Sequence, residues 1–327
     1  MMHYISGEEI ASILTYPKCI ELMRKAMETV ARGDSVLPLR QAMPLPDSDN
    51  KLGVMPGYLG GDDRAFGVKL LSLFPDNPNA GFPSHMGLYT LFDAEHGEPL
   101  AIMSANVLTA IRTACMTAAA TDILARKDAK TMLIVGTGEQ AESHVHALCE
   151  VRQFEEIRIW GRSLEKAQVL AARLQSATPV KLTAVGDLSA ATKGADIITA
   201  VTASPTPLLD KSCLEAGMHV NSVGASHRGV MEIAPDMLAT SRFVVDHLPA
   251  ALDQAGEMLA ALDQAIISGV DMAAEIGDVF LGKEKGRTTD QDVTIYKSLG
   301  IAAQDISAAK YILSEAKARG LGTELSL

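Results

Sequence analysis

The sequence predicts an α/β protein in which a doubly wound parallel sheet is joined to a second, α+β domain. From Lys130 onward, short β-branched runs alternate with helical segments, a pattern typical of parallel sheets covered by helices. Between Val36 and Pro99, short apolar runs are instead separated by Pro, Gly, Asp and Asn, as in a mostly antiparallel sheet. The change of pattern predicts two domains, which agrees with the length of 327 residues.

Composition and charge exclude several classes of protein. Apolar residues make up 47% of the chain and charged residues 21%, so a sizeable core can form and extensive disorder is excluded. The 29 basic and 40 acidic residues give a net charge of −11, which argues against nucleic acid and anionic membrane as partners. The four cysteines lack metal-ligand spacing, so we expect reduced thiols, no metal site and a cytoplasmic location.

The first part of the chain contains a helical pattern, several strand-like runs and a long Ala-rich helix. In order, these elements are expected at 5–33, 52–55, 65–74, 87–92 and 106–125. The stretch from Leu100 to Leu124 is the most apolar of the chain. Its Asn106, Arg112 and Asp122 favour a buried helix over a membrane span, and the N-terminus lacks the features of a secretory signal.

The second part begins with a strand at Thr131–Val135 and continues with alternating elements. Further strands are expected at 157–160, 181–185, 197–200, 219–223 and 243–245, with helices up to about residue 152 and at 164–174. The end of the chain, from Tyr296 to Ala318, is predicted to form one helix.

A glycine-rich turn directly follows the strand at Thr131–Val135. Its sequence is Gly136-Thr137-Gly138-Glu139-Gln140-Ala141, which fits the GxGxxG/A fingerprint. Gly136 permits a tight turn, and Gly138 lets a pyrophosphate approach the start of the following helix. A lone GxGxxG is weak evidence, but its place between a strand and a helix supports a Rossmann-type dinucleotide site.

The end of the second strand of this domain indicates which dinucleotide is bound. NAD-specific folds usually have an acidic residue there, which binds the ribose 2′-hydroxyl. This chain has Arg162 and Ser163 instead, and both can bind a 2′-phosphate. We therefore favour NADPH over NADH, with a solvated surface charge at Arg162 as the alternative interpretation.

Taken together, several motifs resemble the ornithine cyclodeaminase/mu-crystallin family over nearly the whole chain. They are Leu52-Gly53-Val54-Met55-Pro56, Gly67-Val68-Lys69, Pro83-Ser84-His85, Asn106-Val107-Leu108-Thr109-Ala110-Ile111-Arg112-Thr113-Ala114, the IVGTG turn, Val223-Gly224-Ala225-Ser226 and Lys297-Ser298-Leu299-Gly300. The resemblance implies a substrate and dimerisation domain formed by residues 1–120 and 300–327, a Rossmann domain formed by residues 121–299, and a homodimer.

The resemblance also implies which residues contact ligands. Lys69 and Arg112 would face the substrate, with Arg40 as a further contact to its carboxylate. A planar guanidinium holds a carboxylate well, and a buried lysine can exchange a proton, although a structural salt bridge is the alternative for Arg112. His85 could bind substrate or relay a proton, but a structural role fits equally well. Cofactor contacts are expected in the glycine turn, at Arg162 and Ser163, and at Thr109, Val201, Thr202, Val223, Gly224, Ala225, Ser298 and Gly300.

Two positions depart from the cyclodeaminating members of the family. Those members resemble one another in carrying a glutamate in the strand that here contains Met55, and an aspartate where this chain has Ser226. Neither methionine nor serine can act as a carboxylate base. In this respect the sequence is similar to the mu-crystallin branch, whose members reduce cyclic ketimines with NADPH.

The hypothesis that follows is NADPH-dependent reduction of a cyclic imino acid. Candidate substrates are Δ1-pyrroline-2-carboxylate, which gives L-proline, and Δ1-piperideine-2-carboxylate, which gives L-pipecolate. Alternatives are an ornithine cyclodeaminase, a linear amino-acid dehydrogenase such as an alanine dehydrogenase, and a binding protein without turnover.

Overall fold

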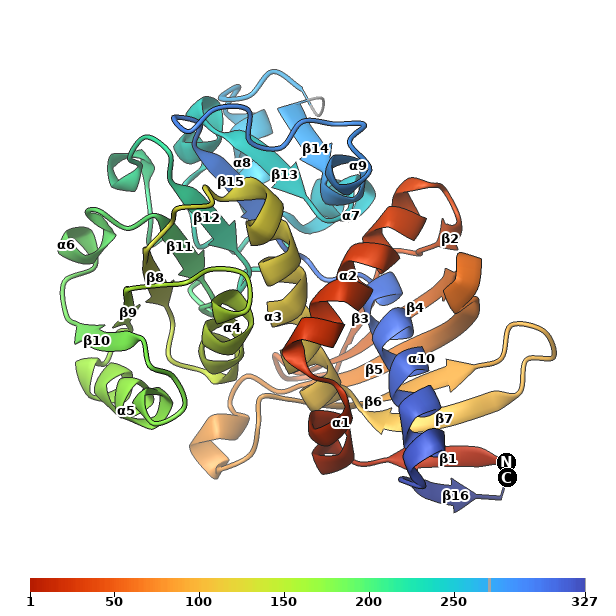
Figure 1. The fold of residues 1–327 in the computed structure, drawn as a ribbon. Coiled ribbons are helices and arrows are strands. Elements are labelled where there is room, and N and C mark those ends of the chain that lie inside the picture. Colours follow the sequence, from red (N-terminus) through yellow and green to blue (C-terminus); the bar gives the residue numbers. More distant parts are fainter. Residues whose placement is uncertain (270–271, 327) are drawn as a thin grey trace. The chain divides into compact units, whose positions relative to one another are not determined.

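The computed structural model describes residues 1–269 and 272–326. The chain divides into two compact units (Figure 1). Unit 1 comprises Met1–Arg112 and Ile301–Leu327, and unit 2 comprises Thr113–Gly300. The sequence prediction put the first boundary after residue 120, and the units divide earlier, between Arg112 and Thr113; both positions lie in helix α3 (Ala105–Leu124).

Unit 1 contains a mixed sheet to which both ends of the chain contribute. Its strand order is β16-β1-β7-β6-β5-β4-β2, with β3 paired to β4. All neighbouring strands are antiparallel except β1 and β7, which agrees with the predicted mostly antiparallel sheet. The strands are β1 (Met2–Ile5), β2 (Ser35–Val36), β3 (Gln41–Pro44), β4 (Lys51–Leu59), β5 (Ala65–Leu73), β6 (His85–Phe92), β7 (Pro99–Ser104) and β16 (Thr323–Leu325).

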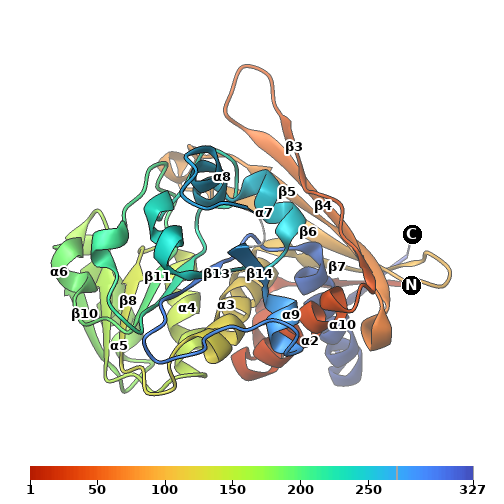
Figure 2. The ribbon, with the colours of Figure 1, turned by 90° about the horizontal axis from the view of Figure 1, so that it is seen from above.

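Helices from the two chain ends pack together in unit 1. They are α1 (Gly7–Ile13), α2 (Tyr16–Ala31) and α10 (Ala302–Arg319), with short 3-10 turns at Gly61–Asp63 and Asn77–Ala80. Helices α2 and α10 lie side by side on the same side of the sheet, which Figure 2 shows nearly edge-on. Helix α10 approaches β4 so closely that a Cβ at Gly57 would lie 2.5 Å from that of Ala302. The helical pattern predicted over 5–33 forms two helices, α1 and α2, and its first residue, Ile5, ends strand β1.

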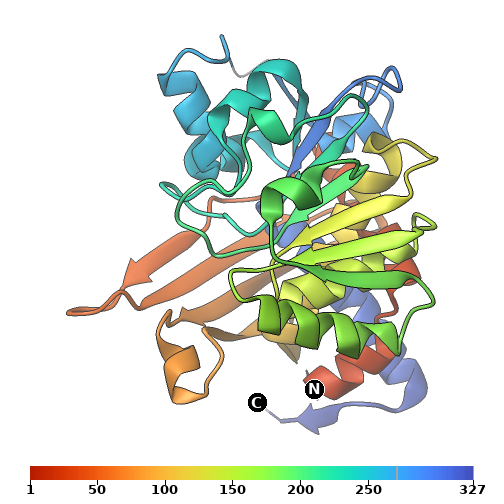
Figure 3. The ribbon, with the colours of Figure 1, turned by 90° about the vertical axis from the view of Figure 1, so that its left-hand side faces the viewer.

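Unit 2 contains the predicted doubly wound sheet, in which every neighbouring pair of strands is parallel (Figure 3). Its order is β10-β9-β8-β11-β12-β15-β13-β14. The strands are β8 (Thr131–Val135), β9 (Glu156–Trp160), β10 (Lys181–Val185), β11 (Ile197–Ala200), β12 (His219–Ser222), β13 (Arg242–Val245), β14 (Ala273–Glu275) and β15 (Thr294–Lys297). The α/β fold class predicted from the sequence is confirmed.

Helices connect the strands of unit 2. They are α4 (Glu139–Cys149), α5 (Leu164–Gln175), α6 (Leu188–Thr192), α7 (Leu248–Gln254), α8 (Gly256–Asp263) and α9 (Ile276–Phe280), with 3-10 turns at Lys211–Cys213 and Pro235–Thr240. The prediction of a helix from Tyr296 was wrong at its start. Tyr296 lies in β15, between β12 and β13, and Gly300 interrupts the chain with φ 74° before α10 begins.

Helix α3 meets the length and composition of a membrane span, but most of its residues are buried inside the protein, as in the core helix of a soluble protein. Its C-terminal carbonyl groups are bound by two arginines. Arg152 donates to the carbonyls of Thr121, Asp122 and Ala125 at 3.0–3.2 Å, and Arg287 donates to that of Leu124 at 2.7 Å. These cations neutralise the negative end of the helix dipole and satisfy carbonyls that lack helical partners.

Candidate active site

A buried cluster of charges in unit 1 contains two of the residues predicted to bind substrate. The carboxylate of Asp305, on α10, accepts hydrogen bonds from Lys69 Nζ at 2.8 Å and from Arg112 Nε at 2.9 Å. Arg112 also donates to Gln304 Oε1 at 2.7 Å. The exposed fractions are 1% for Lys69, 3% for Arg112 and 0% for Asp305, so water screens these charges very little. The structure therefore joins Lys69 and Arg112 through a carboxylate.

The surroundings of Lys69 lower its affinity for a proton. The pKa of Lys69 is lowered to about 7. Burial is the largest cause, the nearby charge of Arg112 adds to it, and Asp305 acts in the opposite direction. For Asp305, burial opposes the charged form, but Arg112 and Lys69 outweigh it and lower the pKa of the carboxyl. A lysine with a pKa near neutrality can both donate and accept a proton under physiological conditions.

The strand register places Met55 and Tyr89 beside Lys69. Met55 on β4 pairs with Lys69 on β5, which pairs in turn with Tyr89 on β6. Met55 is 8% exposed and Tyr89 is fully buried. Thr109 lies on the first turns of α3, where its hydroxyl is 3.4 Å from Lys69 Nζ. An apolar thioether therefore occupies the strand position next to the candidate proton-transfer group.

Two further predicted substrate residues of unit 1 lie outside this cluster. Arg40 is half-buried just before β3, and its charge contributes to the low pKa of Lys69. His85 is exposed at the start of β6, and its Nδ1 lies 2.9 Å from the Ser84 hydroxyl. Asn106 holds this strand end in place, because its side chain donates to the His85 carbonyl at 2.6 Å and accepts from the Gly87 amide at 3.0 Å.

In unit 2, the predicted cofactor residues lie in turns and loops that follow the carboxyl ends of the parallel strands. Dinucleotides bind at this edge in sheets of this kind. The glycine turn joins β8 to α4. Gly136 has φ 140° and donates to the Trp160 carbonyl at 2.8 Å, and a Cβ there would lie 2.7 Å from the Val201 carbonyl oxygen. Gly138 is the N-cap of α4 and has open space around its Cα. The open space at Gly138 leaves the N-terminal amides of α4 accessible, and helix N-termini of this kind can bind a phosphate.

The end of β9 lies beside a cavity of about 300 Å³. It is lined by Thr137, Ser163, Glu165, Lys166, Val169, Leu170 and Arg173. Gly161 allows the glycine turn to approach, because a Cβ there would lie 2.6 Å from Thr137 Cγ2. Ser163 caps α5 by accepting from the Lys166 amide at 3.2 Å, and Arg162 is exposed.

The loops after β11, β12 and β15 hold the remaining cofactor candidates. Glu232 accepts backbone hydrogen bonds from Thr202 and from the amides of 223–225. In the loop after β15, the carboxylate of Asp246 accepts hydrogen bonds from the amides of Leu299 and Gly300 at 2.9 and 2.7 Å. Ser298 is buried and donates its amide to the Ser222 carbonyl, and Ser226 is half-buried in the loop after β12.

Sequence reasoning missed three buried carboxylates in these two regions. Asp305, Glu232 and Asp246 each bind groups that the sequence singles out, yet none of the three was among its candidates. The signal that could have found them is an acidic residue inside an otherwise apolar segment, as in Ile301–Ile306, because such a residue needs a partner when buried.

The ornithine cyclodeaminase/mu-crystallin family model matches residues 3–320. The chain belongs to this family. It is 32% identical to the Delta(1)-pyrroline-2-carboxylate reductase of Bacillus cereus over 325 residues, which cover 99% of each of the two chains. It is 33% identical over 313 residues, covering 94% of this chain and 96% of the relative, to the ketimine reductase mu-crystallin of Mus musculus.

A solved structure has the same fold. The Delta(1)-pyrroline-2-carboxylate reductase of Thermococcus litoralis, in complex with NADH and L-proline, superposes with a TM-score of 0.95. The two proteins are 30% identical, and the match covers 99% of this chain and 100% of the other. The ornithine cyclodeaminase/mu-crystallin chain described here is thus an NAD(P)-dependent enzyme of the imine reductase and dehydrogenase class.

Proposed function

We propose that this enzyme reduces a cyclic imino acid with NADPH, converting Δ1-pyrroline-2-carboxylate to L-proline or Δ1-piperideine-2-carboxylate to L-pipecolate. The names of the Bacillus and Thermococcus relatives support this substrate class. The observation that carries the proposal is the environment of Lys69, which combines a pKa of about 7 with an apolar neighbour, Met55, in the adjacent strand.

The roles of the residues follow from their chemistry. Arg112 and Arg40 would bind the substrate carboxylate, and Lys69 would deliver a proton to the imine nitrogen. A bound nicotinamide cofactor would supply the hydride that the C=N carbon accepts. The proton and the hydride together convert the imine to the secondary amine. Thr109 and Asp305 would keep the Lys69 ammonium oriented, and Ser226 and His85 would contact the substrate.

NADPH is favoured over NADH by the surroundings of the β9 end. A 2′-phosphate would bind to Arg162 and to the Ser163 hydroxyl, whose oxygen already accepts from the Lys166 amide and whose proton remains able to donate. Lys166 and Arg173 line the adjacent cavity and add positive charge, although Glu165 also lines it and Arg173 pairs with Glu142.

The enzyme is proposed to form a cytoplasmic homodimer through the sheet of unit 1. On the face opposite Met55 and Lys69, apolar side chains lie in register across neighbouring strands, including the row Val54, Leu70 and Leu88. Leu70 is 39% exposed and Leu88 47%, while Phe66 and Phe92 stack with centroids 5.1 Å apart on the same face. Exposed apolar surface of this kind is typical of an interface.

Steady-state turnover with defined imines tests the proposal. Purified enzyme is mixed with NADPH or NADH and with one of three substrates: Δ1-pyrroline-2-carboxylate, Δ1-piperideine-2-carboxylate, or pyruvate plus an amine. Oxidation of the cofactor is followed. The expected result is turnover of at least one cyclic imine, with a higher kcat/KM for NADPH, and its loss in Lys69→Met.

Incubating the cofactor-bound enzyme with ornithine as the only substrate distinguishes the cyclodeaminase alternative from imine reduction. Release of ammonia and proline from ornithine without net cofactor oxidation would replace the reductase proposal by cyclodeamination. Turnover of pyruvate and amine but of no cyclic imine would point to a linear amino-acid dehydrogenase.

A further inference from the structure

Glu232 lies where two loops at the carboxyl edge of the unit 2 sheet meet. One loop follows β11 and contains Val201 and Thr202, and the other follows β12 and contains the segment 223–226. Glu232 lies further along this second loop, between Ser222 and the 3-10 turn at Pro235, and it is 0% exposed. Burying a carboxylate this completely requires compensating hydrogen bonds or charges.

Backbone amides from both loops supply that compensation. One carboxylate oxygen of Glu232 accepts from the Thr202 amide. The other accepts from the successive amides of Val223, Gly224 and Ala225 at 3.1, 2.6 and 3.2 Å. Successive amides that converge in this way form an anion-binding concavity, which in this chain is filled by a side chain of the protein itself.

The two loops are also packed backbone against backbone. A Cβ at Gly224 would lie 2.0 Å from the Thr202 carbonyl oxygen, so only glycine permits this approach. The main chain of Glu232 adds a third connection, because its carbonyl accepts from the amides of Leu208 and Leu209 at 2.8 and 3.2 Å. Side chain and main chain of one residue thus join three segments.

A buried lysine supports the same loop from the other side. Lys297 Nζ lies 2.9 Å from Glu257 Oε1 and donates to the Ser222 hydroxyl at 3.2 Å and to the Ala225 carbonyl. Ala225 is therefore held through its amide by Glu232 and through its carbonyl by Lys297. Burial raises the pKa of Glu232, and the positive charge of Lys297 opposes that effect.

We propose that Glu232 is a positioning residue for the nicotinamide cofactor, because it holds the loops after β11 and β12 in one fixed arrangement before the cofactor binds. A site that is already ordered loses less conformational entropy on binding, which increases affinity. The inference rests on the NAD(P) dependence of the family and not on the imine substrate, so it stands or falls separately from the proposed reaction.

Cofactor binding without substrate tests the inference. Trp160 is the single tryptophan of the chain and directly precedes Gly161 and Arg162, so energy transfer to NADPH or NADH reports binding. Glu232→Gln keeps the shape of the side chain but turns an NH2 group toward backbone donors. We expect the dissociation constant of the Glu232→Gln variant for the cofactor to be about tenfold or more above that of the wild-type enzyme, since at least one charge-assisted hydrogen bond is lost.

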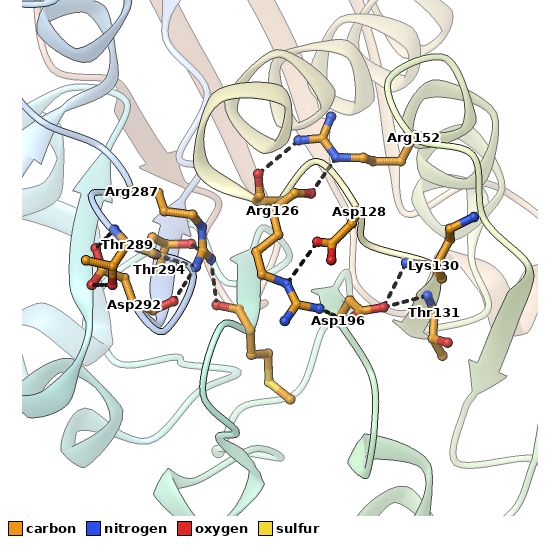
Figure 4. A network of polar contacts seen from close by, with 12 residues as sticks. Arg126, Asp128, Lys130, Thr131, Arg152, Asp196, Arg287, Thr289, Asp292 and Thr294 are labelled. Atoms are coloured by element: carbon orange, nitrogen blue, oxygen red, sulfur yellow. Dashed lines mark hydrogen bonds and ion pairs between the residues drawn. The ribbon is translucent and has the colours of Figure 1, made fainter.

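Asp196→Asn is the matched control. Asp196 also accepts backbone hydrogen bonds, from Lys130 and Thr131 at 2.7 and 2.9 Å, but at the amino-terminal edge of the same sheet (Figure 4). Both variants should lower the melting temperature, and only Glu232→Gln should weaken cofactor binding. Wild-type affinity in a folded Glu232→Gln variant, or equal weakening in both variants, would overturn the inference.

Hydrogen exchange of the wild-type enzyme provides a readout that does not depend on a variant folding. If Glu232 orders the loops in advance, peptides containing Thr202 and 223–225 are protected without cofactor, and added cofactor slows their exchange only slightly. Rapid exchange of these amides in the free enzyme, followed by strong protection on binding, would mean that the cofactor and not Glu232 orders the loops.

Discussion

The carboxylate of Asp305 lies 2.8 Å from the ammonium nitrogen of Lys69, although 236 residues separate them in the sequence. This contact opposes the three effects that lower the pKa of Lys69, which are burial and the charges of Arg112 and Arg40. The protonation of the proposed proton donor therefore depends on Asp305.

Replacing Asp305 by Asn should lower the pKa of Lys69 below 7, because Arg112 and burial remain while the compensating charge is gone. If protonated Lys69 is the proton donor, kcat/KM for imine reduction falls as pH rises above this pKa. The fall should begin at lower pH in the variant, with about tenfold less activity at neutral pH for each unit of pKa lost. NMR of lysine labelled at Cε measures the pKa directly. Gln304→Ala removes a hydrogen-bond partner of Arg112 but keeps the Lys69–Asp305 ion pair, so it should leave the pKa of Lys69 unchanged.

Replacing Arg162 by Glu should raise KM for NADPH by about tenfold or more, because a repulsive charge replaces a favourable one at the 2′-phosphate. KM for NADH should change little, since NADH carries a hydroxyl there. Lys181→Ala is a suitable control. Lys181 is an exposed cation that pairs with Glu156 at the start of β10, at the edge of the sheet opposite to that of Arg162. Equal effects on both cofactors would exclude 2′-phosphate recognition by Arg162.

Glutamate at Leu70 and Leu88 should convert the proposed dimer to a monomer, because it buries charge in an apolar interface. Sedimentation velocity measures the change. Leu252→Glu, at a residue of α7 that is 37% exposed, should leave the mass unchanged. A wild-type enzyme that sediments as a monomer would contradict the interface outright.

Replacing Arg152 by Ala should lower the free energy of unfolding by about 3 kcal/mol, because buried carbonyls at the C-terminus of α3 lose their donor and Asp122 loses one of its two cationic partners. Urea denaturation measures the effect. Lys127→Ala removes an exposed partner of the same Asp122 and should cost less than about 1 kcal/mol.

Acid should destabilise the enzyme through two buried histidines. Burial lowers the pKa of His144 to about 4 and that of His219 to about 3. Below about pH 6.5 the unfolded chain binds protons that the folded chain excludes, so the free energy of unfolding falls as pH decreases toward 4. Each histidine should contribute up to about 1.4 kcal/mol per pH unit. His144→Gln should reduce this slope in urea denaturation, whereas His96→Gln, at an exposed residue, should not.

Local patterns predicted the secondary structure around the glycine-rich turn well. The strand, glycine turn and helix from Thr131 to Cys149 are contiguous, and the structure forms them where the sequence predicts. The strand at Thr294–Lys297 was missed because its four residues are buried between β12 and β13 and therefore show no alternation of polar and apolar residues.

The sequence by itself determined the fold class, the position of the glycine-rich turn and the absence of carboxylates at Met55 and Ser226. These properties are encoded in short segments, because strand and helix periodicity and glycine turns depend on neighbouring residues. Only the tertiary structure decided which buried charges are paired. Asp305 reaches Lys69 through the packing of α10 on the sheet of unit 1, and Glu232 reaches two loops at once through the packing of unit 2. A buried charge is stable only with its partners in place, and those partners are brought together by folding rather than by proximity in the chain.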